Sequence, residues 1–311
     1  MKTRRTLGIA AAGVALYIGL LVWADARNDV FGRLPQVAAL LPLLAASSVL
    51  SWSLRHARWH WLLGRAGHAT PRGRGFLAYL AGFAFTATPG KLGELVRIRY
   101  FGPMGVPPAT VLGVFVFERA LDLLVLLMLA AAGVRDARLF GFLAAFVACG
   151  LAAIVWLGRR PRHLGRPAAW LRLRRQRLPA RLLRTLQRGL QACLQWVRPL
   201  DLLVGLAFGL AAWGVAIGAF VWLLGQLSVV LPAATAWAVL PTAMLAGAAS
   251  MLPGGIGTTE AAIVALLALE GVAVATGLVA AVAIRLAGLW FAVVCGLAAI
   301  TWLEQQAARG A

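Results

Sequence analysis

The sequence FLAYLAGFAFTATPGKLGELVRIR, residues 76–99, consists of an apolar arm, a Pro-Gly break and a charged second arm. The apolar arm, residues 76–90, has 15 residues, whereas a helix needs about 20 apolar residues to cross a bilayer. We therefore predict a re-entrant hairpin that enters the membrane and returns to the side from which it came. Non-helical backbone at membrane depth must be buried in protein or line a wet cavity, so this break is a candidate functional site.

A second break, LPGGIGTTE at residues 252–260, repeats the first. In both, the pattern P-G-x-x-G leads shortly to a glutamate, Glu94 in the first break and Glu260 in the second. An arginine follows 25 residues later each time, as Arg119 and Arg285. The order Pro, Gly, Gly, Glu, Arg therefore indicates an internal repeat.

The composition is that of a polytopic helical membrane protein. Of the 311 residues, 61% are hydrophobic and only 13% are charged, against roughly 25% charged in a soluble domain. The apolar residues form long blocks without strand-like alternation, which excludes a transmembrane barrel. The 30 Lys and Arg outnumber the 10 Asp and Glu, and we interpret this excess of positive charge as the signal that orients loops toward the cytoplasm. No nucleic-acid partner is therefore expected. The three cysteines are scattered and show neither metal-site spacing nor a disulfide framework.

Three predicted crossings lie between the two breaks, at residues 108–133, 139–157 and 200–224. An odd number of crossings places the second hairpin on the opposite face, so we predict an inverted repeat of the kind that surrounds a midplane site in transporters. The alternative is that residues 231–252 span the membrane outright, which would remove the symmetry. The fold class is thus an all-α integral membrane protein with about six transmembrane helices and two re-entrant helical hairpins in an inverted repeat.

The chain is predicted to be a single membrane domain in the bacterial inner membrane, with both termini cytoplasmic. It divides into a first half-repeat at about 35–157, a cytoplasmic basic segment at 158–199 and a second half-repeat at about 200–303. For the first apolar block, residues 7–24, an uncleaved helix is favoured over a signal peptide because the apolar run is long for one.

A block at residues 35–54 ends among aromatic and basic residues, which we interpret as a girdle where the helix leaves the bilayer. Its members are Trp52, Arg55, Arg58, Trp59 and Trp61.

The basic segment holds 12 Arg and no acidic residue between Arg159 and Arg198. Leucines at 182, 186, 190 and 194 recur every four residues and predict an amphipathic helix. Two interpretations stay open for it. The helix lies along the anionic inner leaflet, or it packs against the underside of the helix bundle.

Ionisable side chains at membrane depth are candidate functional groups because burying them is costly. We expect Lys91, Arg119 and Arg285 to receive an anionic headgroup, and the broken helices to direct backbone N–H groups at its phosphate. The alternative is that these charges only form buried ion pairs between helices. The candidate substrate-binding residues are Pro89, Gly90, Lys91, Gly93, Glu94, Arg97, Glu118, Arg119, Asp122, Pro253, Gly254, Gly255, Gly257, Thr258, Glu260 and Arg285.

Catalytic motifs such as HExxH, a nucleophile elbow or a dinucleotide fingerprint do not occur in the sequence, so we expect no enzyme activity and no cofactor. His56 and His60 lie four residues apart, but we read them as interfacial side chains, and no metal site is expected. Thr258 and Thr259 are read as caps of the restarting helix.

Four motifs in order carry a family resemblance, at residues 88–97 (TPGKLGELVR), 117–122 (FERALD), 252–260 (LPGGIGTTE) and 284–285 (IR). They resemble the flippase-like membrane domain of lysylphosphatidylglycerol synthases and their stand-alone relatives, over nearly the whole chain. The resemblance implies movement of a phospholipid or an isoprenoid-linked lipid between leaflets. The synthases add a cytoplasmic aminoacyl-transferase domain that this sequence lacks, so synthase activity is not expected.

The predicted function is therefore a flippase for an anionic lipid, and the expected partner is that lipid. The alternatives are an accessory subunit that docks a lipid- or hopanoid-modifying enzyme, cytoplasmic or membrane-bound, and a membrane-embedded transferase using Glu118 and Asp122. Homo-oligomerisation is left open.

Overall fold

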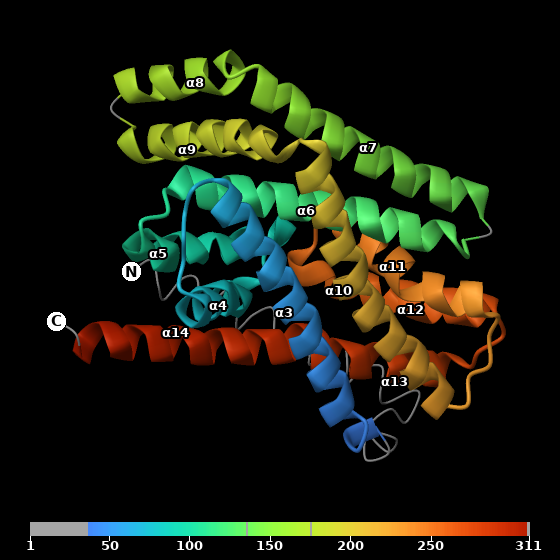
Figure 1. The fold of residues 1–311 in the computed structure, drawn as a ribbon. Helices are drawn as coiled ribbons and strands as arrows, with labels where there is room; N and C mark the ends of the chain where they lie inside the picture. The colour runs from blue at the N-terminus through green and yellow to red at the C-terminus, as the bar shows by residue number, and fades with distance from the viewer. Residues whose placement is uncertain (1–36, 135, 175, 310–311) are drawn as a thin grey trace.

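The computed structural model describes residues 37–134, 136–174 and 176–309, and all secondary structure in these ranges is helical. The predicted first helix, residues 7–24, lies outside them. The longer helices are α3 (Leu41–Arg65), α6 (Pro108–Ala131), α7 (Ala137–Arg159), α9 (Arg177–Cys193), α10 (Pro199–Gln226), α11 (Ala233–Ala249) and α14 (Phe291–Arg309) (Figure 1). The shorter ones are α4 (Arg72–Ala81), α5 (Arg97–Phe101), α8 (Arg162–Leu173), α12 (Thr258–Leu269) and α13 (Val274–Arg285).

Three helices of the described ranges are long and apolar enough to cross a membrane: residues 137–159, 199–226 and 274–309. The last of these is α13 and α14 joined by a π-helical turn at Leu286–Trp290. Helix α6 has 24 residues but carries charged side chains in its middle. Helix α11 has 17 residues and is among the shorter apolar helices, which is the length expected of a hairpin arm. The all-α membrane character is thus confirmed.

Helices α6, α7 and α10 begin within two residues of their predicted starts. Pro108 and Pro199 occupy the first turns of α6 and α10, where a missing N–H costs nothing. Asp136 caps α7 and accepts hydrogen bonds from the backbone N–H groups of Arg138 and Leu139 at 2.8 and 3.2 Å.

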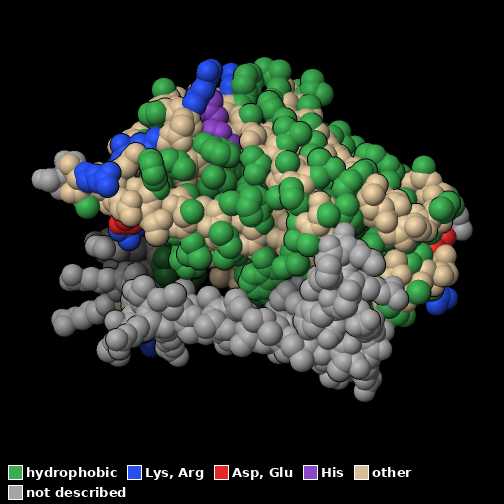
Figure 2. All heavy atoms as spheres, turned by 90° about the horizontal axis from the view of Figure 1, so that it is seen from below, with side chains coloured by type: hydrophobic (Ala, Val, Ile, Leu, Met, Phe, Trp, Pro, Cys, Tyr) green, Lys and Arg blue, Asp and Glu red, His purple; other side chains and the backbone are tan. Residues whose placement is uncertain are grey.

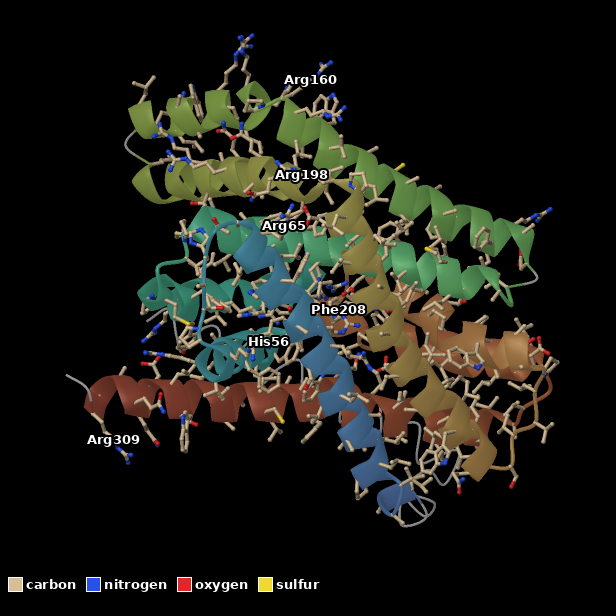
Figure 3. The ribbon with its side chains drawn as sticks, viewed as in Figure 1. His56, Arg65, Arg160, Arg198, Phe208 and Arg309 are labelled. Atoms are coloured by element: carbon tan, nitrogen blue, oxygen red, sulfur yellow. The ribbon has the colours of Figure 1, made fainter. Side chains whose placement is uncertain are left out.

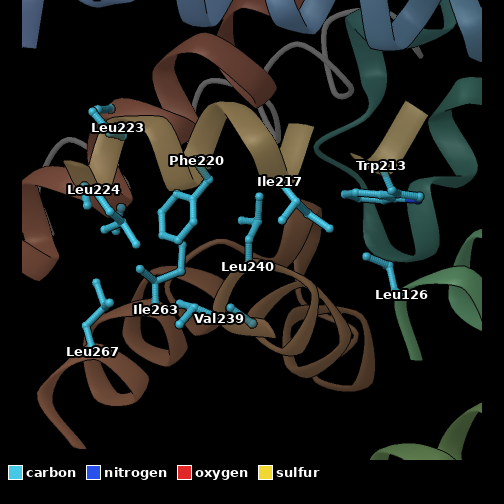
Figure 4. Packing of buried hydrophobic residues seen from close by; sticks show 14 of the residues in the cluster. Leu126, Trp213, Ile217, Phe220, Leu223, Leu224, Val239, Leu240, Ile263 and Leu267 are labelled. Carbon is cyan, nitrogen blue, oxygen red and sulfur yellow. The ribbon is translucent and has the colours of Figure 1, made fainter. Parts of the chain in front are cut away.

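Helices α3 and α10 run side by side across α6, and α8 and α9 lie on the side of α6 away from α14 (Figure 1). The largest buried cluster joins α10 to the second half of the chain. Ile217 and Phe220 of α10 meet Val239 and Leu240 of α11 and Ile263 of α12 (Figure 4). This packing fixes the position of the second break relative to α10.

Helix α9 packs closely on α6. A Cβ on Gly113 of α6 would lie 2.9 Å from the Cβ of Ala192, and Leu190 is only 5% exposed. Small residues allow such close approach between membrane helices. The leucines at 182 and 190 therefore have different surroundings. Packing against the bundle is confirmed at Leu190, whereas Leu182 is 62% exposed and its membrane contact stays a prediction.

Hydrophobic side chains cover the middle of the face shown in Figure 2, and charged ones lie toward its edges. Arg65, Arg160 and Arg198 lie toward the same side of the molecule as α8 and α9 (Figure 3). They belong to the end of α3, the end of α7 and the start of α10. One side of the bundle is therefore strongly basic, as the 158–199 segment predicts.

The predicted end of the second block at residue 54 is wrong. Helix α3 continues to Arg65, and Trp52, Arg55, Arg58 and Trp59 are buried within the protein. Of the five predicted girdle residues, only Trp61 is exposed, at 37%. Aromatic and basic side chains occur together at bilayer interfaces and also around buried ion clusters, and the sequence pattern is the same in both settings.

Candidate functional site

The first break is a helical hairpin. Helix α4 runs into a 3₁₀ turn at Gly82–Phe85, and the second arm starts with a 3₁₀ segment at Pro89–Val96 that packs against that turn. Gly90 and Lys91 at the tip have φ values of 59° and 55°, in the left-handed region. Glycine tolerates this conformation, whereas lysine does so at a cost of about 1–2 kcal/mol. Lys91 is therefore held in place by its surroundings.

The second break has the same design, with α11 and α12 as its arms and a 3₁₀ turn at Pro253–Gly255. Gly254 and Gly255 have φ values of 62° and 64°. Arg285 clamps this tip, because its Nη2 donates to the Gly254 carbonyl at 2.7 Å and its Nε to Glu260 at 2.7 Å. The π-helical turn begins directly after Arg285, and such turns are frequent at functional sites.

The two breaks meet tip to tip. A Cβ on Gly254 would lie 3.3 Å from the Cα of Ala87, and one on Gly90 would lie 3.9 Å from the Cε of Met251. The inference from the repeat, that both breaks contribute to one site, is thus supported by their contact.

Two chambers adjoin the meeting point of the breaks. The first has a cavity volume of about 190 Å³ and is mostly apolar, with Leu123, Leu126 and Phe146 in its wall. The second has about 150 Å³ and a more polar wall that includes Ser47, Ser48 and Ser51 of α3. Five residues line both chambers and so form the waist between them: Lys91, Arg119, Trp213, Met244 and Gly254.

A buried cluster of charges lies beside the waist. Asp122 of α6 binds Arg55 at 2.6 Å and Arg58 at 2.8 Å, both from α3. Glu118, one helical turn earlier, binds Arg58 at 3.1 Å and accepts a hydrogen bond from the hydroxyl of Tyr79 at 2.8 Å. Arg55 and Arg58 were predicted to be interfacial girdle residues. They instead bind the two carboxylates of α6.

The first arginine of the second arm, Arg97, is enclosed by aromatic rings. It lies 3.1 Å from Glu94, and its guanidinium carbon is 4.0 Å from the ring centroid of Tyr79. Glu94 also accepts a hydrogen bond from the hydroxyl of Thr86 at 2.8 Å. Arg97 and Glu94 therefore hold the two arms of the first hairpin together.

The predicted substrate-binding residues divide into two groups. Eight border a chamber: Gly90, Lys91, Glu94, Arg119, Asp122, Gly254, Gly255 and Arg285. Of these, Glu94 is buried. The other eight border neither chamber: Pro89, Gly93, Arg97, Glu118, Pro253, Gly257, Thr258 and Glu260.

Residues outside the predicted set also belong to the site. They are Arg55, Arg58, Thr86, Trp213 and Tyr79. For Arg55 and Arg58 a signal was available, since two carboxylates on one face of α6 require more positive charge than the adjacent Arg119 supplies.

One local expectation is wrong. The cap of α12 is not a threonine: Glu260 reaches back and accepts a hydrogen bond from the Gly257 N–H at 2.9 Å, while the Thr258 hydroxyl donates to the Gly255 carbonyl. For the same reason the Gly257 N–H does not point at a ligand. The Lys91 N–H is likewise bonded, to the Thr88 carbonyl at 2.9 Å. These two N–H groups are therefore satisfied within the protein.

Lys91 and Arg119 are the two cations that line both chambers. Of the ion pairs within the described residues, none involves Lys91. Arg119 reaches Asp122 at 3.1 Å and Glu118 at 3.4 Å, but its Nε has no hydrogen-bond partner. Within the part of the chain that the structure describes, no three His, Cys, Asp or Glu side chains gather as metal ligands.

The comparisons with known proteins give one match. The family model described as the lysylphosphatidylglycerol synthase TM region matches residues 10–296. No curated protein and no solved structure matches the chain. The predicted family is thus confirmed over nearly the whole sequence.

Proposed function

The chain belongs to the family of the lysylphosphatidylglycerol synthase transmembrane region, and from that premise we propose that it moves an anionic lipid between membrane leaflets. The lipid is a phospholipid or an isoprenoid-linked lipid, and the protein acts as a translocator without enzyme activity. One observation carries the proposal: two broken helices meet at a cavity whose waist holds Lys91, a cation with no ion-pair partner among the described residues.

The backbone at Lys91 supports a binding role. By the repeat, Lys91 corresponds to Gly255, and both residues have left-handed φ values, 55° and 64°. A glycine would satisfy this conformation without strain, yet the first break has a lysine there. Backbone strain of this kind is characteristic of functional sites, where the surrounding structure holds a side chain in position.

The chamber walls suit an amphipathic ligand. The waist offers Lys91 and Arg119 to a negatively charged headgroup, and arginine can bind phosphate through two parallel hydrogen bonds. The first chamber beside it presents Leu123, Leu126 and Phe146 to an apolar chain. A lipid lying across the waist would thus keep its charge at the cations and its hydrocarbon on the apolar wall.

For the arrangement in the membrane we propose six spans and two re-entrant hairpins related by an inverted repeat, in the bacterial inner membrane with cytoplasmic termini. The short α11 and the contact between the breaks support this arrangement. The basic side formed by the ends of α3 and α7 and the start of α10 is the cytoplasmic one on this proposal.

The test is lipid translocation by the purified protein in liposomes, with fluorescent phosphatidylglycerol and, in parallel, fluorescent phosphatidic acid, and a quencher added outside. Wild type is expected to accelerate exchange between leaflets. Lys91→Gly relieves the left-handed strain, so its thermal stability is expected to equal or exceed that of wild type, while translocation falls at least tenfold. The matched control is Arg99→Gln, which removes one positive charge at an exposed position paired with Glu304 and is expected to translocate normally.

A Lys91→Gly protein that translocates as fast as wild type would contradict the assignment of the site. A wild-type protein that moves no lipid would contradict the proposed function and leave the accessory-subunit alternative.

A further inference from the structure

The charges around the two chambers do not balance. Counting the described side chains that border a chamber, together with their ion-pair partners, there are six cations and four carboxylates. The cations are Arg55, Arg58, Lys91, Arg97, Arg119 and Arg285, and the carboxylates are Glu94, Glu118, Asp122 and Glu260. The cluster therefore carries two positive charges in excess.

The excess lies in the first half of the chain. Arg285 and Glu260 form one pair at 2.7 Å, so the second break is neutral. In the first half, three carboxylates serve four arginines and one lysine.

The excess charge is accessible at the waist. Arg58 and Arg97 are enclosed, with side chains 0% and 1% exposed, and Arg55 lies 2.6 Å from Asp122. Lys91 has no carboxylate at ion-pair distance, and the Nε of Arg119 is unpartnered. Both side chains line both chambers. A ligand at the waist therefore meets Lys91, which pairs with no carboxylate of the described residues, and the unpartnered Nε of Arg119.

From this imbalance we infer that the lipid at the waist carries two negative charges on its headgroup. Uncompensated charge is costly away from bulk water, and a ligand that matches it in sign and number removes that cost. A phosphodiester such as phosphatidylglycerol supplies one charge and leaves the cluster at plus one. A phosphate monoester, a diphosphate diester or a pair of phosphodiesters in one lipid supplies two. The inference rests on the proposed lipid site and narrows its substrate to dianionic lipids.

The experiment measures lipid binding to the purified full chain in detergent, apart from transport. Phosphatidic acid and phosphatidylglycerol with identical acyl chains are compared at pH 7.5 and pH 5. The second ionisation of a phosphate monoester has a pKa of about 6, so phosphatidic acid is mostly dianionic at the first pH and monoanionic at the second. Phosphatidylglycerol has one charge at both.

We expect phosphatidic acid to bind at least tenfold tighter than phosphatidylglycerol at pH 7.5, and this preference to shrink to under threefold at pH 5. Lys91→Gly lowers the excess of positive charges from two to one, so it is expected to shrink the preference for phosphatidic acid at pH 7.5 as well. The Arg99→Gln control is expected to keep the full preference. Cardiolipin and an isoprenyl diphosphate sugar, measured in parallel at pH 7.5, separate two phosphodiesters from a diphosphate as the source of the charge.

Equal binding of phosphatidic acid and phosphatidylglycerol at pH 7.5, with both weakened in Lys91→Gly, would overturn the two-charge inference and leave the lipid site standing. Binding of both lipids that Lys91→Gly leaves unchanged would overturn the site and the inference together.

Discussion

Arg285 and Glu260 form the most complete ion pair of the second break, and replacing Arg285 by Gln tests what the pair does. Their side chains are only 6% and 12% exposed. The substitution leaves Glu260 without its cation, and it also removes the Nη2 hydrogen bond to the Gly254 carbonyl at the tip.

The expected loss follows from these contacts. Removing one partner of a buried pair costs about 3–5 kcal/mol because the other charge is left uncompensated. For a chain of this size that corresponds to a fall in Tm on the order of 10 °C. Glu260→Gln alone leaves Arg285 unpaired and is expected to cost a similar amount, although the amide oxygen can still cap the Gly257 N–H.

Thermal unfolding in detergent, followed by tryptophan fluorescence and by size-exclusion recovery after heating, measures the effect. The double variant Glu260→Gln with Arg285→Gln contains no unpaired charge, so it is expected to recover at least half of the lost Tm. A single variant within 2 °C of wild type, or a double variant as unstable as the two losses combined, would refute the assignment of Arg285 to structure.

Three further predictions concern other parts of the molecule. Gly254→Ala places a methyl group 3.3 Å from the Cα of Ala87, at a residue with a left-handed backbone, so it is expected to push the two tips apart and to slow translocation at least tenfold in the liposome assay. The control Gly102→Ala has open space around the added Cβ and is expected to translocate normally. In a cysteine-free background, Arg72→Cys at the start of α4 is expected to react with a membrane-impermeant thiol reagent only from the cytoplasm. Leu269→Cys at the end of α12 is expected to react only from outside. Reaction of both cysteines from one side would rule out the inverted repeat. Neutralising the exposed arginines of residues 159–166 is expected to weaken sedimentation with anionic vesicles, while translocation in liposomes persists. Loss of translocation in a folded variant would instead show that this segment takes part in the translocation mechanism.

The helices were predictable because their apolar blocks are long and their ends are marked. Pro108 and Pro199 at helix starts, and the two Pro-Gly breaks, determine boundaries that the structure reproduces within a few residues. The family was predictable for the same reason, since its motifs lie in these breaks and in the helices that follow them.

The partners of buried charges were not predictable at the same level. Arg58 and Glu118 are 60 residues apart in sequence and meet only because α3 crosses α6. The local pattern therefore indicates a bilayer interface for Arg55 and Arg58, because tryptophans and basic residues are enriched there. The predicted role of Glu260 as a ligand-binding residue conceals its role as the cap of α12, although a glutamate three residues into a helix is the usual partner of a free N-terminal N–H.

The spacing that made Arg119 and Arg285 look equivalent conceals a difference in role. Each follows its break glutamate by 25 residues, but only Arg285 binds that glutamate, at 2.7 Å. Arg119 binds the carboxylates of its own helix, while Glu94 at the first break binds Arg97. The first half thus has an additional cation, Lys91, at the position where the second half has Gly255. It also has no Arg119–Glu94 pair to match the Arg285–Glu260 pair that neutralises the second break. On this reasoning the second break is electrically neutral, and the first break carries the charge that a lipid headgroup would meet.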